Sequence, residues 1–360
     1  MSENTPTWST ITSRLVRGLE LETSEASWAM DEVMSGNATA VQLAGFLVSL
    51  QSKGVSSAEL AALADSMVSH ARPVNAPQES IDIVGTGGDL AQTVNISTMA
   101  SMVIASTGRT VVKHGNRASS SKSGSADVLE ALGVRLDLPV PVVEELVGKI
   151  GMTFLFAQVF HPSMRFAAEA RRGLGIPTVM NILGPITNPA QPRASAVGVA
   201  DESIAPTVAG VFASRGTSAL VFRGQDGLDE LTVTAPSDVW EVRGGEVRRH
   251  LLDPQALLGI ERSAHDALRG GTVEENAQVV RDLFAGVVDG RMGPIRDAVL
   301  LNAAAGVTAF DGIGQSAEDG FEERFVAAFA QAREALDSGR PAELIRRWAA
   351  ASQEAFGAEA

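Results

Sequence analysis

A glycine-rich turn, GTGGD at residues 85–89, is the feature that most constrains how this chain folds. It directly follows a short apolar segment, residues 81–84, and precedes an apolar run with helical spacing, residues 97–105. A strand, a glycine turn and a helix in this order are typical of open α/β sheets, which bind ligands beyond the carboxyl ends of their strands. Because glycine lacks a Cβ atom, the turn lets the backbone approach a phosphate or a sugar closely. The pattern predicts a ligand site, with a plain tight turn as the alternative.

The glycine turn matches neither of two common nucleotide-binding motifs. Leu90 stands where a dinucleotide-binding fingerprint has its third glycine. No GxxxxGK[ST] sequence of a Walker A loop occurs either. The turn alone therefore leaves the kind of ligand open.

Strand-like and helical segments alternate after residue 76. We expect strands at residues 81–84, 109–113, 152–156, 194–199 and 219–222, with helices between them, such as residues 97–105 and 127–132. This alternation predicts a mostly parallel central sheet with helices packed on both faces. From residue 272 to residue 348 the chain is expected to be mainly helical.

The first seventy or so residues predict helices. Thr39 with Gln42 and Ser56 with Glu59 form capping boxes, a signal that starts a helix. An earlier helix is expected over residues 25–35. Residues 71–77 then break the periodicity and resemble a linker.

Composition excludes several classes of function. The net charge of −14 argues against a nucleic-acid or anionic-membrane surface, so an anionic substrate must meet local cations, backbone N–H groups or metal ions. The absence of cysteine excludes disulfides, thiolate zinc sites and cysteine nucleophiles. The amino-terminal sequence lacks a secretory signal pattern, and the longest apolar run, residues 41–50, is too short to span a bilayer. We expect a soluble, cytoplasmic protein.

Three further segments suit an anionic ligand. NIST at residues 95–98 begins a helix and suits a phosphate, although a plain N-cap is the alternative. Residues 113–125 follow a strand and combine lysine, arginine and several serines, which suits a multiply charged anion better than a solvated loop. DGLDEL at residues 226–231 places adjacent carboxylates beyond another strand, where they suit magnesium; a hairpin turn at Asp226 is compatible with this role.

Together these segments resemble anthranilate phosphoribosyltransferase, an enzyme family of tryptophan biosynthesis. The resemblance is carried by GTGGD (85–89), NIST (95–98), KHGNRA, SS and SGSAD within 113–127, HPSMR (161–165), RRGLGIPTVMNILGPITNPA (171–190), GLDEL (227–231) and DAVLLNAA (297–304). It implies an α/β fold of the nucleoside phosphorylase/phosphoribosyltransferase type. A small helical domain, residues 1–76 completed by about 161–190, would accompany a larger phosphoribosyl-binding domain, residues 77–160 and 191–360.

The resemblance implies transfer of the phosphoribosyl group of phosphoribosyl pyrophosphate (PRPP) to the amine of anthranilate, with release of pyrophosphate. PRPP would contact Gly85, Gly88, Asp89, Thr93, Asn95, Ile96, Ser97, Thr98, Lys113, His114, Gly115, Asn116, Arg117, Ala118, Ser119, Ser120, Ser121 and Ser125, of which residues 113–121 would form a mobile loop. Anthranilate would contact Gly85, Asn116 and Arg171. Ser97, Asp229 and Glu230 would hold Mg²⁺, with two ions expected per active site. Lys113, Asn116 and Arg171 would be the catalytic residues.

Several expectations remain open at the level of sequence. Leu90, Ser119 and Arg223 depart from the residues most often found in the family, which affects loop detail. His114 and His161 are possible proton acceptors, but structural roles are at least as consistent with their positions. The family typically dimerises through the helical domain, and a separate anthranilate synthase partner is conceivable.

Two rival functions share this architecture. A pyrimidine nucleoside phosphorylase also uses a glycine-rich loop and a lysine-serine motif, but the sequences HGNRA and GLDEL favour the transferase. A non-catalytic relative that binds nucleic acid would need a basic face, which the acidic composition argues against.

Overall fold

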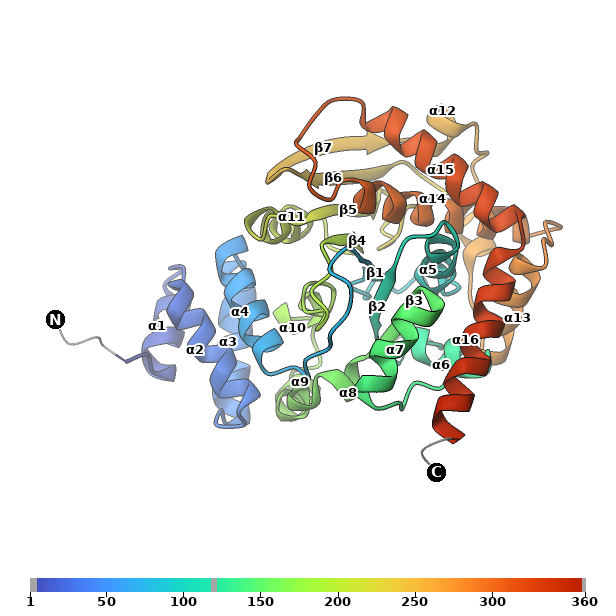
Figure 1. Ribbon diagram of the computed structural model, residues 1–360. Helices are drawn as coiled ribbons and strands as arrows, with labels where there is room; N and C mark the ends of the chain where they lie inside the picture. The colour runs from blue at the N-terminus through green and yellow to red at the C-terminus, as the bar shows by residue number, and fades with distance from the viewer. Residues whose placement is uncertain (1–4, 118–121, 358–360) are drawn as a thin grey trace.

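A bundle of helices opens the part of the chain that the computed structural model describes, residues 5–117 and 122–357. Its members are α1 (Trp8–Val16), α2 (Thr23–Met34), α3 (Ala40–Lys53) and α4 (Ser57–Ser69). Both predicted capping boxes are confirmed, since Thr39 accepts a hydrogen bond from the Gln42 N–H and Ser56 from the Glu59 N–H. The bundle lies to one side of the molecule, away from the carboxyl-terminal helices (Figure 1).

The described residues form a seven-stranded sheet with the strand order β3-β2-β1-β4-β5-β6-β7. The strands are β1 (Ile81–Gly85), β2 (Val111–Gly115), β3 (Met152–Phe156), β4 (Ala194–Gly198), β5 (Ser218–Gly224), β6 (Ser237–Arg243) and β7 (Glu246–Leu252). The pairs from β3 through β5 are parallel, whereas β6 and β7 add an antiparallel hairpin. Gly85 lies opposite Gly198 in the register, so the carboxyl ends of β1 and β4 meet at one edge. The predicted mostly parallel sheet is confirmed.

Alternate residues of the central strands enter two separate hydrophobic cores. On β5, Leu220 and Phe222 belong to one core and Ala219 and Val221 to the other, as the two-residue period of a strand requires. The first core also contains α5 (Ile96–Ser106), α14 (Met292–Asp311), α15 (Phe321–Asp337) and α16 (Arg340–Gly357). The second contains α11 (Ala205–Ser214) and the amino-terminal bundle. Helices therefore cover both faces of the sheet.

Residues 161–190 return from the sheet to the amino-terminal bundle. They form η1 (Pro162–Ala167), α9 (Ala168–Leu174), α10 (Val179–Ile182) and η2 (Gly184–Ile186). Ala170 and Met180 are buried in the same core as the bundle, and α9 packs against α3. This packing agrees with the expected contact to the helical region, while the division into domains remains a prediction.

The remaining helices lie around the sheet. They are α6 (Ser125–Ala131), α7 (Val140–Ile150), α8 (Ala157–Phe160), α12 (Pro254–Leu258), η3 (His265–Leu268) and α13 (Val273–Phe284). Within the described ranges, no helix combines the length and the apolar character that crossing a membrane requires.

The element predictions have two errors. The strand predicted at residues 152–156 is confirmed by β3, but the one predicted at 109–113 lies two residues further on, in β2. Residues 113–115 therefore belong to a strand, and the prediction that they begin a mobile loop is wrong. The hairpin of β6 and β7 was not predicted, because four of the seven residues of β7 are exposed and its charged residues Glu246, Arg248 and Arg249 leave no regular apolar alternation.

Candidate active site

A cavity of about 280 Å³ opens at the carboxyl ends of β1 and β2. Fifteen of the predicted site residues line it: Gly85, Gly88, Asp89, Thr93, Asn95, Ile96, Ser97, Lys113, His114, Gly115, Asn116, Arg117, Ser125, Asp229 and Glu230. Sequence reasoning missed other lining residues, among them Thr86, Gly87, Gln92 and Ser123. Ala118, Ser119, Ser120 and Ser121 lie outside the described residues. Segments between residues 84 and 125 thus meet residues 229 and 230, more distant in the sequence, around one space.

The glycine turn shapes one wall of the cavity. Gly87 and Gly88 have φ angles of 69° and 90°, in the left-handed region that favours glycine. Leu90 has a φ of 59° and is 79% exposed, so this side chain occupies a strained position without burying apolar surface. A glycine, which the family resemblance leads us to expect here, would adopt this φ angle without strain.

Buried carboxylates close the cavity from the loop after β5. Asp229 is buried and accepts a hydrogen bond from the Gly87 N–H at 2.7 Å. Burial, followed by the charge of Asp89, raises the pKa of Asp229 to about 7. Burial also raises the pKa of Glu230 well above its usual range, with Asp229 adding to the effect and Lys113 opposing it. Negative charge is therefore concentrated here with little compensation.

The chemistry of these side chains suits a hard cation. Glu230 accepts a hydrogen bond from the backbone of Ser97. Ser97 therefore lies next to the two carboxylates, Asp229 and Glu230, on the same side of the cavity. Carboxylate and hydroxyl oxygens are the ligands that Mg²⁺ prefers. The described residues hold no cluster of three or more His, Cys, Asp or Glu side chains arranged as a complete metal cage. A magnesium ion would therefore take further ligands from substrate oxygens and water, as it commonly does.

Lys113 lies beneath the cavity within the sheet. Its ammonium group donates hydrogen bonds to the Ile83 carbonyl and, at 3.3 Å, to the Ser97 hydroxyl. Burial lowers the pKa of Lys113, while Asp82 and Glu230 raise it. The lysine thus compensates part of the buried negative charge.

Asp82 and Asn188 support this lysine, and sequence reasoning missed both. Asp82 is fully buried on β1, where it accepts hydrogen bonds from the His114 N–H at 3.0 Å and from the Asn188 amide at 2.8 Å. Burial raises the pKa of Asp82 to about 6, against the charge of Lys113. A lone carboxylate in the apolar sequence IDIV was the available signal, because a buried charge needs partners.

The start of α5 forms another wall. Asn95 is the N-cap residue, yet its side chain makes no capping bond; it donates to the Ser123 carbonyl at 3.1 Å and accepts from Asn276 at 2.8 Å. The backbone N–H groups here already have partners, since the Ile96 N–H donates to the Val94 carbonyl at 2.7 Å and the Ser97 N–H to Glu230. Thr98 is fully buried and donates to the Ser125 hydroxyl at 3.0 Å, so it is not among the lining residues and holds Ser125 instead.

The positive charge after β2 is partly compensated within the chain. Arg117 forms ion pairs with Asp127 at 2.7 Å and Glu130 at 2.6 Å. Its backbone N–H donates to the Asn116 side chain at 2.8 Å. At the end of β5, Arg223 donates to the Ala200 carbonyl at 2.9 Å. Both arginine side chains are thus engaged within the fold, and their charges are less available to a ligand than the sequence indicates.

Two histidine rings lie at a tilt to each other beside the cavity, in neutral form. The rings of His114 and His161 are 5.1 Å apart and hydrogen-bond to the Gly184 and Thr187 carbonyls. Burial lowers the pKa of His114 to about 3 and that of His161 to about 4. Neither imidazole is therefore charged near neutral pH.

Arg171 lies on α9 and is not among the residues that line this cavity. Its guanidinium is half-buried, and burial lowers its pKa. Within residues 5–117 and 122–357, it has no ion pair or hydrogen bond through its side chain. A half-buried cation in an acidic protein is suited to an anionic ligand.

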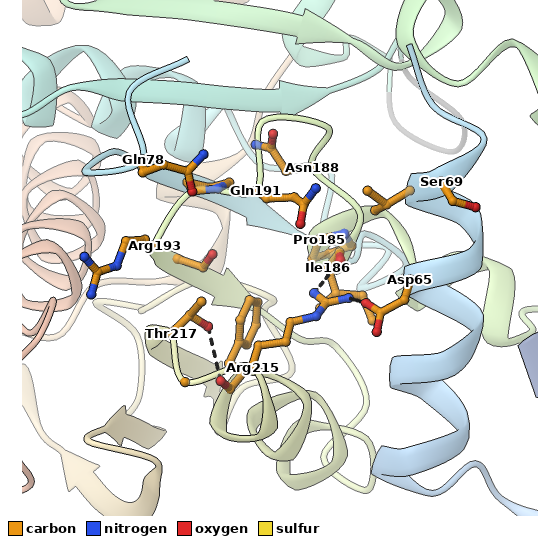
Figure 2. Close-up of a pocket in the computed structure, with 15 residues that line it drawn as sticks. Asp65, Ser69, Gln78, Pro185, Ile186, Asn188, Gln191, Arg193, Arg215 and Thr217 are labelled. Atoms are coloured by element: carbon orange, nitrogen blue, oxygen red, sulfur yellow. Dashed lines mark hydrogen bonds and ion pairs between the residues drawn. The ribbon is translucent and has the colours of Figure 1, made fainter. Parts of the chain in front are cut away.

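A larger cavity of about 590 Å³ lies at the opposite edge of the sheet, where the parallel strands begin. Figure 2 shows Arg215 reaching across it to Asp65 of α4, at 2.6 Å. The same guanidinium donates to the Ile186 carbonyl at 2.8 Å. This space lies between the bundle and the sheet. Arg215 is paired within it, whereas Arg193, which also lines it, has no ion pair with a described residue.

Comparison with known proteins decides the family. The model of the glycosyl transferase family helical bundle domain matches residues 9–71, and that of the family's a/b domain matches residues 77–342. An anthranilate phosphoribosyltransferase of Arthrobacter sp. is 57% identical over 344 residues, 96% of this chain and 96% of the relative. The chain belongs to the anthranilate phosphoribosyltransferase family.

Other members of the anthranilate phosphoribosyltransferase family agree over the full length. The enzyme of Acidothermus cellulolyticus is 53% identical over 360 residues, 100% of this chain and 99% of the relative. The solved structure from Thermus thermophilus is 40% identical with a TM-score of 0.86, covering 95% of this chain and 99% of that one. The structure from Saccharomyces cerevisiae in complex with PRPP and Mg is 25% identical, with a TM-score of 0.84, covering 98% and 99%. A helical domain with a larger α/β domain is thus the shared architecture.

Proposed function

We propose that this chain transfers the phosphoribosyl group of PRPP to the amine of anthranilate, giving N-(5-phosphoribosyl)anthranilate and pyrophosphate. The observation that carries the proposal is the pair of neighbouring carboxylates, buried Asp229 and half-buried Glu230, set against the glycine turn and the start of α5. Buried acidic groups beside a helix start suit a ligand that brings both phosphates and magnesium. The family relatives named above support the same reaction.

Magnesium is the cofactor that we propose, and the yeast relative was solved with PRPP and Mg. Ser97, Asp229 and Glu230 would hold it, with two ions per active site. When bound, magnesium neutralises the negative charge that builds on pyrophosphate as the bond to ribose breaks.

The chain's own groups bind and orient the donor. Gly87 and Gly88 expose backbone close to the sugar, and Ser97 at the start of α5 lines the same cavity with its hydroxyl group. Lys113 adds one positive charge beneath the site. Because the transition state separates charge between ribose and pyrophosphate, this fixed arrangement stabilises it electrostatically.

Arg171 is the residue that we assign to the carboxylate of anthranilate, with Asn116 and Gly85 beside the ring. Its half-buried guanidinium offers a fork of N–H donors, which matches a planar carboxylate. The aromatic amine is uncharged near neutral pH, so no strong base is needed before attack. Neutral His114 and His161 are consistent with this, because their role is to hydrogen-bond backbone carbonyls.

The assembly that we propose is a homodimer formed through the helical domain. Exposed apolar side chains on α1 and α3, Val16, Val41 and Val48, support a covered surface there. A cytoplasmic location and a separate anthranilate synthase partner complete the proposal.

Anthranilate fluorescence provides the test of this function. The purified chain is expected to consume anthranilate only when both PRPP and Mg²⁺ are present. Loss of signal without PRPP would contradict the proposal, and so would phosphorolysis of thymidine at a comparable rate. A salt-dependent shift with DNA would instead favour a nucleic-acid-binding relative.

A further inference from the structure

Helix α14 carries one polar side chain in a long apolar stretch. Asn302 is fully buried between Leu301 and Ala303, which are also fully buried. It lies in DAVLLNAA, residues 297–304, a sequence typical of the family to which the proposed function gives no task. Burying an amide without hydrogen-bond partners costs free energy, so its presence requires an explanation.

The Asn302 side chain forms a paired set of hydrogen bonds with one backbone residue, Leu231. Its Oδ1 accepts from the Leu231 N–H at 3.1 Å, and its Nδ2 donates to the Leu231 carbonyl at 2.9 Å. Nδ2 also donates to the Ala298 carbonyl of its own helix at 2.9 Å. Reversing the amide would oppose donor to donor and acceptor to acceptor. The contact is therefore specific in orientation and imitates a strand pairing across the first core.

Leu231 directly follows the two carboxylates, and the other side of this segment is fixed as well. A Cβ atom at Gly198 would lie 1.6 Å from the Asp229 carbonyl oxygen, and one at Gly85 would lie 2.2 Å from the Asp229 carboxylate. Residues 229–231 are thus held between the ends of β1 and β4 on one side and α14 on the other.

Electrostatics works against this arrangement. Asp229 and Glu230 are neighbours in the chain, and Asp89 lies close enough to add its charge to both. Like charges at short range repel strongly when little water separates them. Without hydrogen bonds that fix their backbone, residues 229–231 would move toward solvent, and Glu230 would lose its contact with Ser97.

We propose that Asn302 is a positioning residue for the magnesium site: its paired hydrogen bonds to Leu231 hold Asp229 and Glu230 at the carboxyl ends of β1 and β4. The proposal rests on the proposed function. Asn302 touches neither substrate nor metal, and it acts only through the backbone of the acidic segment.

The test compares Asn302→Leu, which removes the hydrogen bonds at similar volume, with Asn302→Asp. A buried aspartic acid in its protonated form keeps one donor and one acceptor for Leu231, so Asn302→Asp is expected to recover most of the function. Thr308→Val is the matched control, because Thr308 is a buried polar residue further along the same helix. It changes a hydroxyl to a methyl without touching the acidic segment.

Mn²⁺ binding, followed by electron paramagnetic resonance with PRPP and without anthranilate, is the main measurement. Asn302→Leu is expected to weaken Mn²⁺ binding at least tenfold while changing the KM for anthranilate less than threefold. Thr308→Val should bind Mn²⁺ as the wild type does. A folded Asn302→Leu protein with Mn²⁺ affinity within twofold of wild type would overturn the proposal.

Hydrogen exchange of the wild type covers the case in which Asn302→Leu does not fold. The Leu231 amide is expected to exchange slowly, and in Asn302→Asp to remain protected. Fast exchange of this amide in the wild type would overturn the inference. The two proposals can fail separately. If the Mn²⁺ affinities of the wild type and its variants follow the expected order but the wild type does not consume anthranilate, the proposed function fails and the positioning role of Asn302 stands.

Discussion

The two cavities at opposite edges of the sheet differ in how their charges are compensated. In the larger one, about 590 Å³, the Arg215 guanidinium already pairs with Asp65 and with the Ile186 carbonyl. In the smaller one, about 280 Å³, Asp229 and Glu230 are crowded together, and only the charge of Lys113 and a hydrogen bond from the Ser97 backbone oppose the rise in the pKa of Glu230. Uncompensated buried charge costs several kcal/mol, so a fold keeps it where a ligand supplies the compensation. Charge, more than size, distinguishes the site.

Asp229→Asn is expected to have the largest effect. It removes a carboxylate that we assign to magnesium, and it should lower the rate of transfer by about 100- to 1000-fold, in the range seen when one electrostatic group of an active site is lost. It should also raise the magnesium concentration needed for half-maximal activity. The measurement is anthranilate fluorescence across a magnesium titration.

Asp65→Asn is the matched control, because it removes a carboxylate from the larger cavity. Its activity should stay within about twofold of wild type. A larger loss from Asp65→Asn than from Asp229→Asn would reverse the comparison between the two edges.

Arg171→Ala is expected to have the next largest effect. Losing a charged pair of hydrogen bonds to a carboxylate should raise the KM for anthranilate about 10- to 100-fold, corresponding to about 1.5–3 kcal/mol. The KM for PRPP should change little. Steady-state kinetics in both substrates separates the two constants.

Arg172→Ala, at the exposed neighbouring position, provides the control for Arg171→Ala. It should leave both constants close to wild type. Equal increases in the two KM values for Arg171→Ala would contradict its assignment to anthranilate.

Thermal stability without divalent cations should depend on pH through Asp229. Its pKa is raised to about 7 in the folded state from 3.8, so the folded protein retains a proton that the unfolded chain loses between these values. Stability therefore falls as pH rises from about 4 to 7. The Tm of Asp229→Asn should exceed that of wild type by several degrees at pH 8 and by little at pH 4.

Calorimetry at both pH values, with and without Mg²⁺, checks this prediction. Magnesium should raise the Tm of the wild type more at pH 8 than at pH 4, because it competes with protons for the carboxylates. An Asp229→Asn protein that is less stable than wild type at pH 8 without cations would show that the carboxylate is compensated within the fold.

Arg215→Met should have the smallest effect. The ion pair with Asp65 is partly exposed, so solvent screens it, and its loss together with the bond to Ile186 should cost about 1 kcal/mol. The Tm should fall by about 1–2 °C with unchanged kinetics. A marked loss of activity in Arg215→Met would indicate that the larger cavity has a functional role.

Local patterns predicted much of the fold. Capping at Thr39 and Ser56, strand–helix alternation and the glycine turn are short-range signals, and the structure agrees with each. The hairpin of β6 and β7 was missed although Gly244 and Gly245 offered a turn signal, because the charged residues of β7 mask its period. Boundaries also shifted, as in β2.

Sequence predicted which residue types gather at the site but not how they are held. The segments that carry Asp229 and Lys113 are bonded at their neighbouring residues, Leu231 to Asn302 and His114 to Asp82, at long separations along the chain. Periodicity reports which face of a helix is buried, and it does not name the partner across the core. The ion pairs of Arg117 were equally hidden, since a basic loop in the sequence suggests free charge.

The Asp229 backbone fills the space that a side chain at position 198 would need, and this has a consequence for mutational tolerance. The φ angle of Gly198 is not positive, so a larger residue would be excluded by the Asp229 backbone and not by its own conformation. In a saturation scan, position 198 would reject even alanine and rank with positions that touch a ligand. A scan interpreted without coordinates would then assign a substrate contact to a residue whose whole contribution is to leave room.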